Sequence, residues 1–383
     1  MQNMIKMSLV AAVAVAGLSS NVAAQPLAEA IKDVDVSGSV VFRYNDYTDD
    51  KNVNESFDYS KNYYKIATSL KSKVNDYVTA TVRVVTGTGV LGAGADNDGN
   101  LTGLDTRNAA DANPTIQVNQ ANFTVKTDVA TVIAGKQGLT TPWTVAIDSD
   151  SNEQTGTGLL ALVPAGPVTI AAAYFNQTNL EGAHAIIDGD ENIATVGVLG
   201  TAGPVSLDAW YLDMQDTFDS FTVGAKATIE MITAELRYTS LDLDGNNQPD
   251  NNALTAKVSA NVGPVATYVQ YATTDKEGGL TALDADAKTT TQGWNVNIHN
   301  KADADFYRVG ASMDVMSGLN VAVNYATMDY ANKTEESELY TQITHTMGKN
   351  LVTYVRFGTF EEEVANDETQ DAITGRLQVE YKF

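Results

Sequence analysis

The chain has no cysteine, so no disulfide framework holds it and no thiol chemistry is available to it. Only three histidines occur in 383 residues, and none stands in the constellation with serine that a nucleophilic site needs. No cluster of histidine and cysteine suggests zinc either. We expect no enzymatic activity, since chance carboxylate pairs among 48 acidic residues are no indication of glycosidase chemistry.

Basic residues are also scarce. The chain has 24 Lys and Arg against 48 Asp and Glu, which gives a formal net charge of −24 at pH 7. Such an excess of acids argues against nucleic-acid binding, which requires a basic patch. It is compatible with a surface or pore that attracts cations, and equally with simple solubility.

Long apolar runs are absent from all but the N-terminus, so we expect no transmembrane helix. Near the N-terminus, Lys6 precedes the apolar stretch 9–18, and the small residues 22–24 form a cleavage site. That stretch is too short to span a bilayer as a helix. We therefore predict a cleaved signal peptide at residues 1–24, followed by a single domain at 25–383.

The chain does contain a repeated alternation of apolar and polar residues, and the last seven residues show it best. Their apolar face consists of Leu377, Val379, Tyr381 and Phe383. Residues two apart share one face of a strand, so this face is aromatic and would be an aggregation hazard in water. In a bilayer it suits a strand that faces lipid, with its terminal aromatics at the interface. Similar segments of about ten residues recur from residue 33 to the C-terminus.

The connections between these segments alternate in length. Short turns rich in Gly, Pro and Asn lie at 74–76, 164–167, 201–204, 262–264, 316–318 and 347–350. Long and mostly acidic loops lie at 46–60, 86–114, 139–156, 176–191, 242–251, 274–303 and 361–370. Short turns at one end and long loops at the other are typical of an outer-membrane barrel. A soluble sandwich need not alternate in this way, and no fixed repeat length indicates a β-helix.

We therefore predict an all-β fold, an antiparallel transmembrane β-barrel of about 18 strands, with 16 as the alternative. Barrels of about sixteen to eighteen strands enclose a water-filled lumen, whereas about eight strands leave an interior filled by side chains. The lumen of this chain is expected to be open to water.

Successive side chains of a strand point alternately outward and inward, and this parity assigns a set of basic side chains to the lumen. A charged side chain facing hydrocarbon costs roughly 2–4 kcal/mol at the bilayer midplane, so bases on strands are expected to point inward. We call this predicted set the basic wall. It consists of Arg43, Arg83, Lys136, Arg237, Arg308, Arg356 and Arg376. These bases could line an ion path, pair with lumen acids, or do both.

The third long loop is the predicted constriction. It follows the segment 132–137 and carries a small acidic cluster, Asp148, Asp150 and Glu153. Folded inward, these carboxylates would face the basic wall across a narrow opening and favour cations. The alternative is an ordinary solvated surface loop.

Three features resemble the Campylobacter-type major outer-membrane porins: the leader, the stretch 134–137 followed by Pro142 and Trp143, and the last strand ending at Phe383. The resemblance covers essentially the whole mature chain. It implies an eighteen-stranded barrel in a Gram-negative outer membrane, in contact with lipid and lipopolysaccharide. It also implies a homotrimer, an inward-folded third loop, a mild cation preference and calcium near the constriction. Tyr381 and Phe383 would be the signal for the barrel-assembly machinery.

One acidic loop is a calcium candidate in its own right. Oxygen-bearing side chains alternate there as in calcium loops, at Asp242, Asp244, Asn246 and Asp250. The loop lacks the sixth-position glycine and the later glutamate of an EF-hand. Asp, Asn and Gly are also the usual residues of a hairpin tip, so both interpretations stay open.

The predicted function is passive diffusion of ions and small hydrophilic solutes, weakly selective for cations, with no cofactor required. The alternative is a barrel whose long loops act as an adhesin or as a structural surface. The segment 285–303 fits an extra strand, a plug or a subunit clamp equally well.

Overall fold

The computed structural model describes residues 34–49, 59–86, 102–104, 116–180, 187–245, 249–331, 334–365 and 367–383. The predicted signal peptide, residues 1–24, lies outside this part of the chain. Within the described ranges no helix is both long and apolar enough to cross a membrane.

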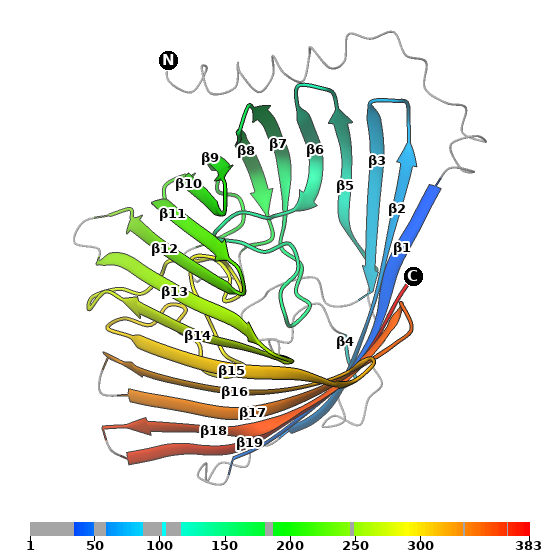
Figure 1. Ribbon diagram of the computed structural model, residues 1–383. Helices are drawn as coiled ribbons and strands as arrows, with labels where there is room; N and C mark the ends of the chain where they lie inside the picture. The colour runs from blue at the N-terminus through cyan, green and yellow to red at the C-terminus, as the bar shows by residue number, and fades with distance from the viewer. Residues whose placement is uncertain are drawn as a thin grey trace.

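The strands form one continuous antiparallel sheet that closes into a barrel (Figure 1). β4 continues the line of β3 beside β2, because β2 pairs first with β4 and then with β3. The 19 strand segments therefore make a closed barrel of 18 strands, as predicted. The bounds are β1 Val34–Asp49, β2 Tyr59–Lys73, β3 Val78–Thr86, β4 Thr102–Leu104, β5 Ile116–Lys126, β6 Thr131–Gly138, β7 Thr155–Ala165, β8 Val168–Thr178, β9 Ile193–Ala202, β10 Val205–Met214, β11 Phe218–Ile229, β12 Ile232–Leu243, β13 Asp250–Val262, β14 Val265–Thr274, β15 Asp305–Met316, β16 Leu319–Tyr330, β17 Thr334–Met347, β18 Leu351–Val364 and β19 Asp367–Lys382.

The barrel closes where its first and last strands meet. β1 and β19 pair from Ser39 opposite Lys382 to Asp49 opposite Ala372. Beyond this ladder, Gly38 and Phe383 exchange two backbone hydrogen bonds, of 2.9 and 3.0 Å. The C-terminal aromatic strand therefore has no free edge, which removes the aggregation hazard of an exposed strand.

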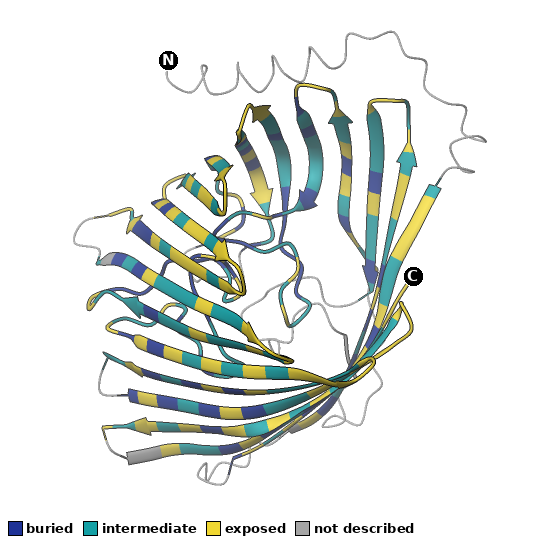
Figure 2. Ribbon diagram, in the orientation of Figure 1, coloured by how far each residue is buried: buried dark blue, intermediate teal, exposed yellow. Residues whose placement is uncertain are grey.

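Buried and exposed residues alternate along many of the strands (Figure 2), as expected of a barrel whose apolar side chains face outward and whose polar ones face the lumen. On β1, Val40 and Phe42 are exposed on the outside, whereas Arg43 is completely buried inside. Tyr381 and Phe383 also lie outside, with their ring centroids 6.1 Å apart. A surface with so many exposed large apolar residues requires lipid around it.

The short connections are tight turns in which glycine has a conformational role. Gly263 has a φ of +60° in the two-residue turn between β13 and β14, and Gly203 has +59° between β9 and β10. A hairpin turn needs positive φ at such positions, and glycine adopts it at no steric cost.

Short turns and long connections alternate from β1 to β9, and the long connection at 275–304 is present too. The prediction of a long loop at 361–370 is wrong: these residues extend β18 and β19, which pair from Glu361 opposite Asp371 and are joined by residues 365–366.

Two long connections lie inside the ring of strands (Figure 1). We call residues 139–154, between β6 and β7, the third loop, and residues 275–304, between β14 and β15, the crossing loop. One apolar cluster joins both loops to β8–β12, and its members larger than alanine are Leu139, Trp143, Phe175, Leu180, Ile187, Ile193, Leu212, Met214, Phe218, Leu241, Leu280 and Leu283. A second cluster joins the later half of the crossing loop to β14–β19 through Val296, Ile298, Phe306, Met328 and Phe360. The crossing loop thus contacts two different sides of the lumen.

Candidate constriction of the barrel

The third loop is held against the basic wall by Asp150. One carboxylate oxygen of Asp150 accepts from Arg43 at 3.1 Å and from Arg376 at 2.7 Å. Arg43 also donates to the backbone oxygens of Ser149 and Asp150, both at 3.3 Å. Gln378 and Asn45 accept from the two Nε atoms of these arginines and fix their orientation. The loop tip therefore touches the wall where β1 and β19 close the barrel.

Glu153 makes a second and more deeply buried contact with the wall. Arg83 donates to its two carboxylate oxygens at 2.8 and 2.7 Å, a paired geometry typical of strong arginine–carboxylate recognition. Lys65 lies 2.7 Å from the same carboxylate, and Asn119 donates to it at 3.1 Å. Glu153 and Lys65 are 1% and 3% exposed, so the lumen wall and the loop exclude water here.

These contacts differ from the arrangement expected from the sequence. Asp150 and Glu153 were expected to face the basic wall across an opening, but they touch it directly. The physical reason is that a buried carboxylate is costly unless it is paired and hydrogen-bonded. The loop folds inward as predicted, and its ion pairs close the side of the lumen lined by β1–β3, β5 and β19.

The same contacts explain the acidities of these two carboxyls. Burial alone would raise the pKa of Asp150, but Arg376 and Arg43 outweigh burial and hold the pKa below its ordinary value. Burial also opposes ionisation of Glu153, yet the hydrogen bonds of Arg83 and the charge of Lys65 lower its pKa to about 2. Both carboxylates are ionised at neutral pH and largely neutralised by their partners.

Asp148, the remaining predicted constriction residue, belongs to a different environment. It accepts from the backbone and the side chain of Asn152, at 2.7 and 2.6 Å. Burial raises its pKa to about 6 despite those bonds, and the charges of Asp150 and Asp286 add to the effect. In the described residues Asp148 has no basic partner within ion-pair distance.

The third and crossing loops meet beside Asp148. Trp143 and Pro142 accept backbone hydrogen bonds from the crossing loop at 2.8 and 3.2 Å. Asp286 accepts from the backbone of Ser149 at 2.6 Å, and Asp284 accepts from Gln154 at 2.9 Å. We call Asp148, Asp284 and Asp286 the junction acids.

The junction acids lie close together because the two acidic loops meet in the lumen. Burial raises the pKa of Asp284 to about 7, and the nearby charges of Asp148 and Asp286 contribute to that shift. Asp284 and Asp286 were not among the residues expected to form the constriction. A lumen position, as a plug, was one of three alternatives for 285–303, beside an extra strand and a subunit clamp, so the sequence did not predict the proximity of Asp284 and Asp286 to Asp148.

The crossing loop is anchored on the opposite side by β17, which pairs Glu336 with Lys301 of the loop at 3.6 Å and binds the loop backbone through Glu338. Glu338 of β17 accepts backbone hydrogen bonds from Trp294 and Asn295, both at 2.7 Å. The Trp294 ring lies 5.0 Å from the Arg356 guanidinium and 5.9 Å from that of Arg376, within reach of a cation–π attraction. Segment 285–303, which could have been a strand, a plug or a subunit clamp, is a lumen segment that partly fills the barrel.

The rest of the basic wall divides into paired and unpaired residues. Arg237 donates twice to Asp208 at 2.8 Å, and Arg308 donates to the backbone of Gln292 at 2.7 Å. Lys136 is half-buried on β6 opposite Ala121, and in the described part of the chain it forms no ion pair with the third loop. Its membership of the wall stays a prediction.

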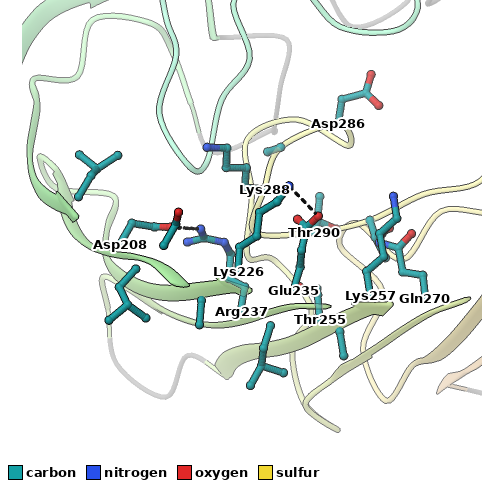
Figure 3. Close-up of a pocket in the computed structure, with 18 of the residues that line it drawn as sticks. Asp208, Lys226, Glu235, Arg237, Thr255, Lys257, Gln270, Asp286, Lys288 and Thr290 are labelled. Carbon is teal, nitrogen blue, oxygen red and sulfur yellow. Dashed lines mark hydrogen bonds and ion pairs between the residues drawn. The ribbon is translucent and has the colours of Figure 1, made fainter. Parts of the chain in front are cut away.

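A cavity of about 790 Å³ remains beside the crossing loop (Figure 3). It lies between residues 285–292 and the inner faces of the strands from β8 to β15. Its lining also includes Pro167, in the turn between β7 and β8, and Thr201, near the end of β9. The cavity therefore extends from the loops within the lumen to the short-turn end of the barrel.

The calcium candidate is placed only in part. Asp242 and Asp244 are exposed at the end of β12, and Asp242 pairs in register with Asp250 of β13. Asn246 and the side chain of Asp250 lie outside the described residues. Carboxylates at a hairpin end suit the oxygen preference of calcium, but the described atoms do not complete a ligand set, and calcium there stays a prediction.

Solved structures of other proteins share this barrel. OpdK from Pseudomonas aeruginosa has a TM-score of 0.72 and 14% identity, with 91% of this chain and 99% of that chain covered. A BenF-like porin from Pseudomonas fluorescens Pf-5 has a TM-score of 0.74 and 14% identity, with 92% and 99% covered. At such low identity the likeness shows the fold alone.

Sequence comparison is more specific. No curated protein shows a significant match to the chain. The family model described as Campylobacter major outer membrane protein matches residues 2–383. Since that match spans nearly the whole chain, this outer-membrane β-barrel belongs to the Campylobacter major outer membrane protein family.

Proposed function

We propose that the protein is a passive diffusion channel for ions and small hydrophilic solutes, driven only by their gradients. The observation that carries the proposal is the cavity of about 790 Å³ left beside two loops that fold into a closed barrel. A lumen narrowed by anchored loops limits solutes by size, and the charged groups around the opening act on those that enter. No covalent step or cofactor is needed.

The proposal includes a weak preference for cations. Asp150 and Glu153 contribute little to it, because their charges are compensated by arginine and lysine at 3.1 Å or less. The junction acids are the better candidates, since Asp286 is exposed and Asp148 has no basic partner among the described residues. Carboxylates beside an opening favour cations over anions.

The cellular context belongs to the same proposal. We infer export through a cleaved signal peptide at 1–24, insertion among outer-membrane lipid and lipopolysaccharide, and assembly into a homotrimer. The outward position of Tyr381 and Phe383 supports a role for this last strand as the signal of the barrel-assembly machinery, because the pair would be accessible before insertion.

Liposome swelling tests the channel directly. Purified protein in vesicles should admit neutral sugars at rates that fall steeply with sugar size, while vesicles without protein stay closed. An adhesin with a blocked lumen is the alternative, and it predicts no swelling with even the smallest sugar. That result would overturn the channel proposal.

A further inference from the structure

The two loops occupy the lumen unequally. Asp150 and Glu153 bring the third loop into contact with β1–β3, β5 and β19, with ion pairs of 2.7 to 3.1 Å. On the other side, the cavity lies between the crossing loop and the inner faces of β10–β14 (Figure 3), and Gln270 of β14 reaches the loop by donating to Thr291 at 2.6 Å. The open space of the lumen therefore lies on the side opposite the wall contacts of Asp150 and Glu153.

The lining of this cavity is basic in a chain that is acidic overall. Five basic and three acidic side chains line it: Lys226, Arg237, Lys257, Lys288 and Arg308 against Asp208, Glu235 and Asp286. Two of the bases are compensated by the wall itself. Arg237 pairs with Asp208 at 2.8 Å, and Lys226 pairs with Glu235 at 3.1 Å.

Among the described residues the other bases form no ion pair with a carboxylate of the wall, although Lys257 is the register partner of Glu235 on β12. Arg308 is tied to the backbone of Gln292 and to the hydroxyl of Tyr340, both at 2.7 Å. Lys257 lies 4.9 Å from the ring centroid of Tyr268, and Lys288 is exposed on the crossing loop. Across the described ranges neither lysine forms an ion pair, so both ammonium groups act on what enters the cavity.

The lysines come from two different elements. Lys257 rises from β13 beside Gln270, whereas Lys288 belongs to the loop segment above the strands (Figure 3). The separation of these elements matters because charges from two sides of an aqueous passage act together on a solute between them. At physiological ionic strength that action extends over roughly 8 Å.

We propose that the path of solutes runs through this cavity, between the crossing loop and the inner faces of β10–β14, and that Lys257 and Lys288 are its selectivity-determining cations. They attract anionic groups and retard small cations locally, in opposition to the junction acids nearby. The inference rests on the proposed channel function and adds where the path lies and which residues act on its contents.

Charge reversal tests the two named lysines. Lys257→Glu and Lys288→Glu should each shift the cation-to-anion permeability ratio by about twofold or more towards cations, because each replaces a positive charge in the path by a negative one. Lys73→Glu is the matched control, since Lys73 is exposed beside Asp76 at a short turn and does not line the cavity. The measurement is the reversal potential across a planar bilayer under a KCl gradient.

Introduced thiols test the path independently of charge balance. The chain has no cysteine, so Lys257→Cys and Lys288→Cys each provide a single reactive thiol. A small sulfonate-bearing thiol reagent added to open channels should lower the unitary conductance of both variants. Val269→Cys, whose side chain is 58% exposed on the outer face of β14, should be unaffected.

The outcomes separate this inference from the channel proposal. A wild-type protein without conductance overturns both. A conducting wild type whose lysine variants keep the wild-type reversal potential, and whose thiols leave conductance unchanged on modification, overturns the path alone. A shift in Lys73→Glu equal to that of the lysine variants also overturns it.

Discussion

The third loop and the crossing loop both fold into the lumen, but they are held there by different chemistry. Buried ion pairs attach the third loop to the wall, where Glu153 meets Lys65 and Arg83. Backbone amides attach the middle of the crossing loop, where Trp294 and Asn295 donate to Glu338, and a longer ion pair of 3.6 Å, between Lys301 and Glu336, lies near its end. The first anchor joins opposite charges on two elements, and the second joins one carboxylate to groups that every residue possesses.

The two kinds of anchor differ in how much free energy is lost when one partner is removed. Removing one partner of a buried ion pair leaves an uncompensated buried charge, which costs about 3–5 kcal/mol. Hydrogen bonds from neutral donors to a charged acceptor are worth about 1.5–3 kcal/mol each. A glutamine at Glu338 loses one such hydrogen bond, whereas a glutamine at Glu153 removes a buried counter-charge, so we expect the isosteric change to loosen the third loop more than the crossing loop.

The largest effect is expected from Glu153→Gln. The amide keeps the shape of the side chain but leaves Lys65 and Arg83 without their counter-charge, and destabilises the anchored loop by about 3–5 kcal/mol. Hydrogen exchange of the amides of 139–154 should accelerate, and unitary conductance should become noisier and larger. Asp76→Asn is the control, because its pair with Lys73 is exposed, does not line the cavity and is worth about 0–1 kcal/mol. Equal behaviour of the two variants would contradict the ion-pair anchor.

A smaller effect is expected from Glu338→Gln. One of its carboxylate oxygens accepts from the Trp294 amide and the other from the Asn295 amide, so the amide side chain keeps one acceptor and loses the other. Exposure of the crossing loop to trypsin at Lys288 and Lys301 should rise several-fold, with the barrel intact. Glu338→Ala should raise trypsin cleavage more than Glu338→Gln does, since it removes both acceptors. Unchanged cleavage in the alanine variant would show that the loop does not depend on this anchor.

The junction between the loops should respond to pH. The pKa values of Asp148 and Asp284, about 6 and about 7, are raised from an ordinary 3.8, so both carboxyls lose their charge as the pH falls from 8 to 5. Cation preference, measured as a reversal potential, should weaken over this range. Asp148→Asn with Asp284→Asn should remove the dependence, and a pH response that survives in this double variant would exclude the junction acids as its source.

The shifted pKa values also make the folding stability depend on pH, and the raised pKa values of Asp148 and Asp284 act in the opposite sense to the lowered pKa of Glu153. Between about pH 4 and pH 7 the folded protein binds more protons at Asp148 and Asp284 than the unfolded chain, so their contribution declines as the pH rises. Glu153, with a pKa of about 2, contributes above its ordinary pKa of 4.5 and loses that contribution only as the pH falls towards 2.

The smallest effect concerns calcium at the end of β12. If calcium binds there, chelation should lower the thermal midpoint of the protein slightly, and Asp242→Asn with Asp244→Asn should abolish the difference. Both side chains are exposed, so the substitutions themselves should change stability by less than about 0.5 kcal/mol. A calcium-dependent shift that persists in the double variant would place any calcium elsewhere.

Much of the barrel could be predicted because its signals are local. Alternation along 377–383 indicates which face of β19 meets lipid, and the same parity places Arg43 inside. The position of the third loop was predictable in outline, since Asp150 and Glu153 are conspicuous acids in a lumen expected to be basic. Their direct contact with the wall was not, because a sequence does not give the distance between a loop and a strand far from it.

The crossing loop was harder to predict for a physical reason. Its anchor at Glu338 uses backbone amides, which leave no mark in a sequence. A partial signal was present in Leu280, Leu283 and Val296, because buried apolar side chains are unusual in a loop that only meets water. The junction of Asp148 with Asp284 and Asp286 depends on both loops being placed, so it was not predictable either.

The most direct test is the current through single molecules of the purified protein in a planar bilayer under a KCl gradient at pH 8. We predict discrete conductance steps and a reversal potential that weakly favours cations, set by the junction acids against the lysines of the cavity. Steps that favour anions would keep the channel and contradict the role given to the junction acids. A silent bilayer containing folded protein would contradict the channel itself.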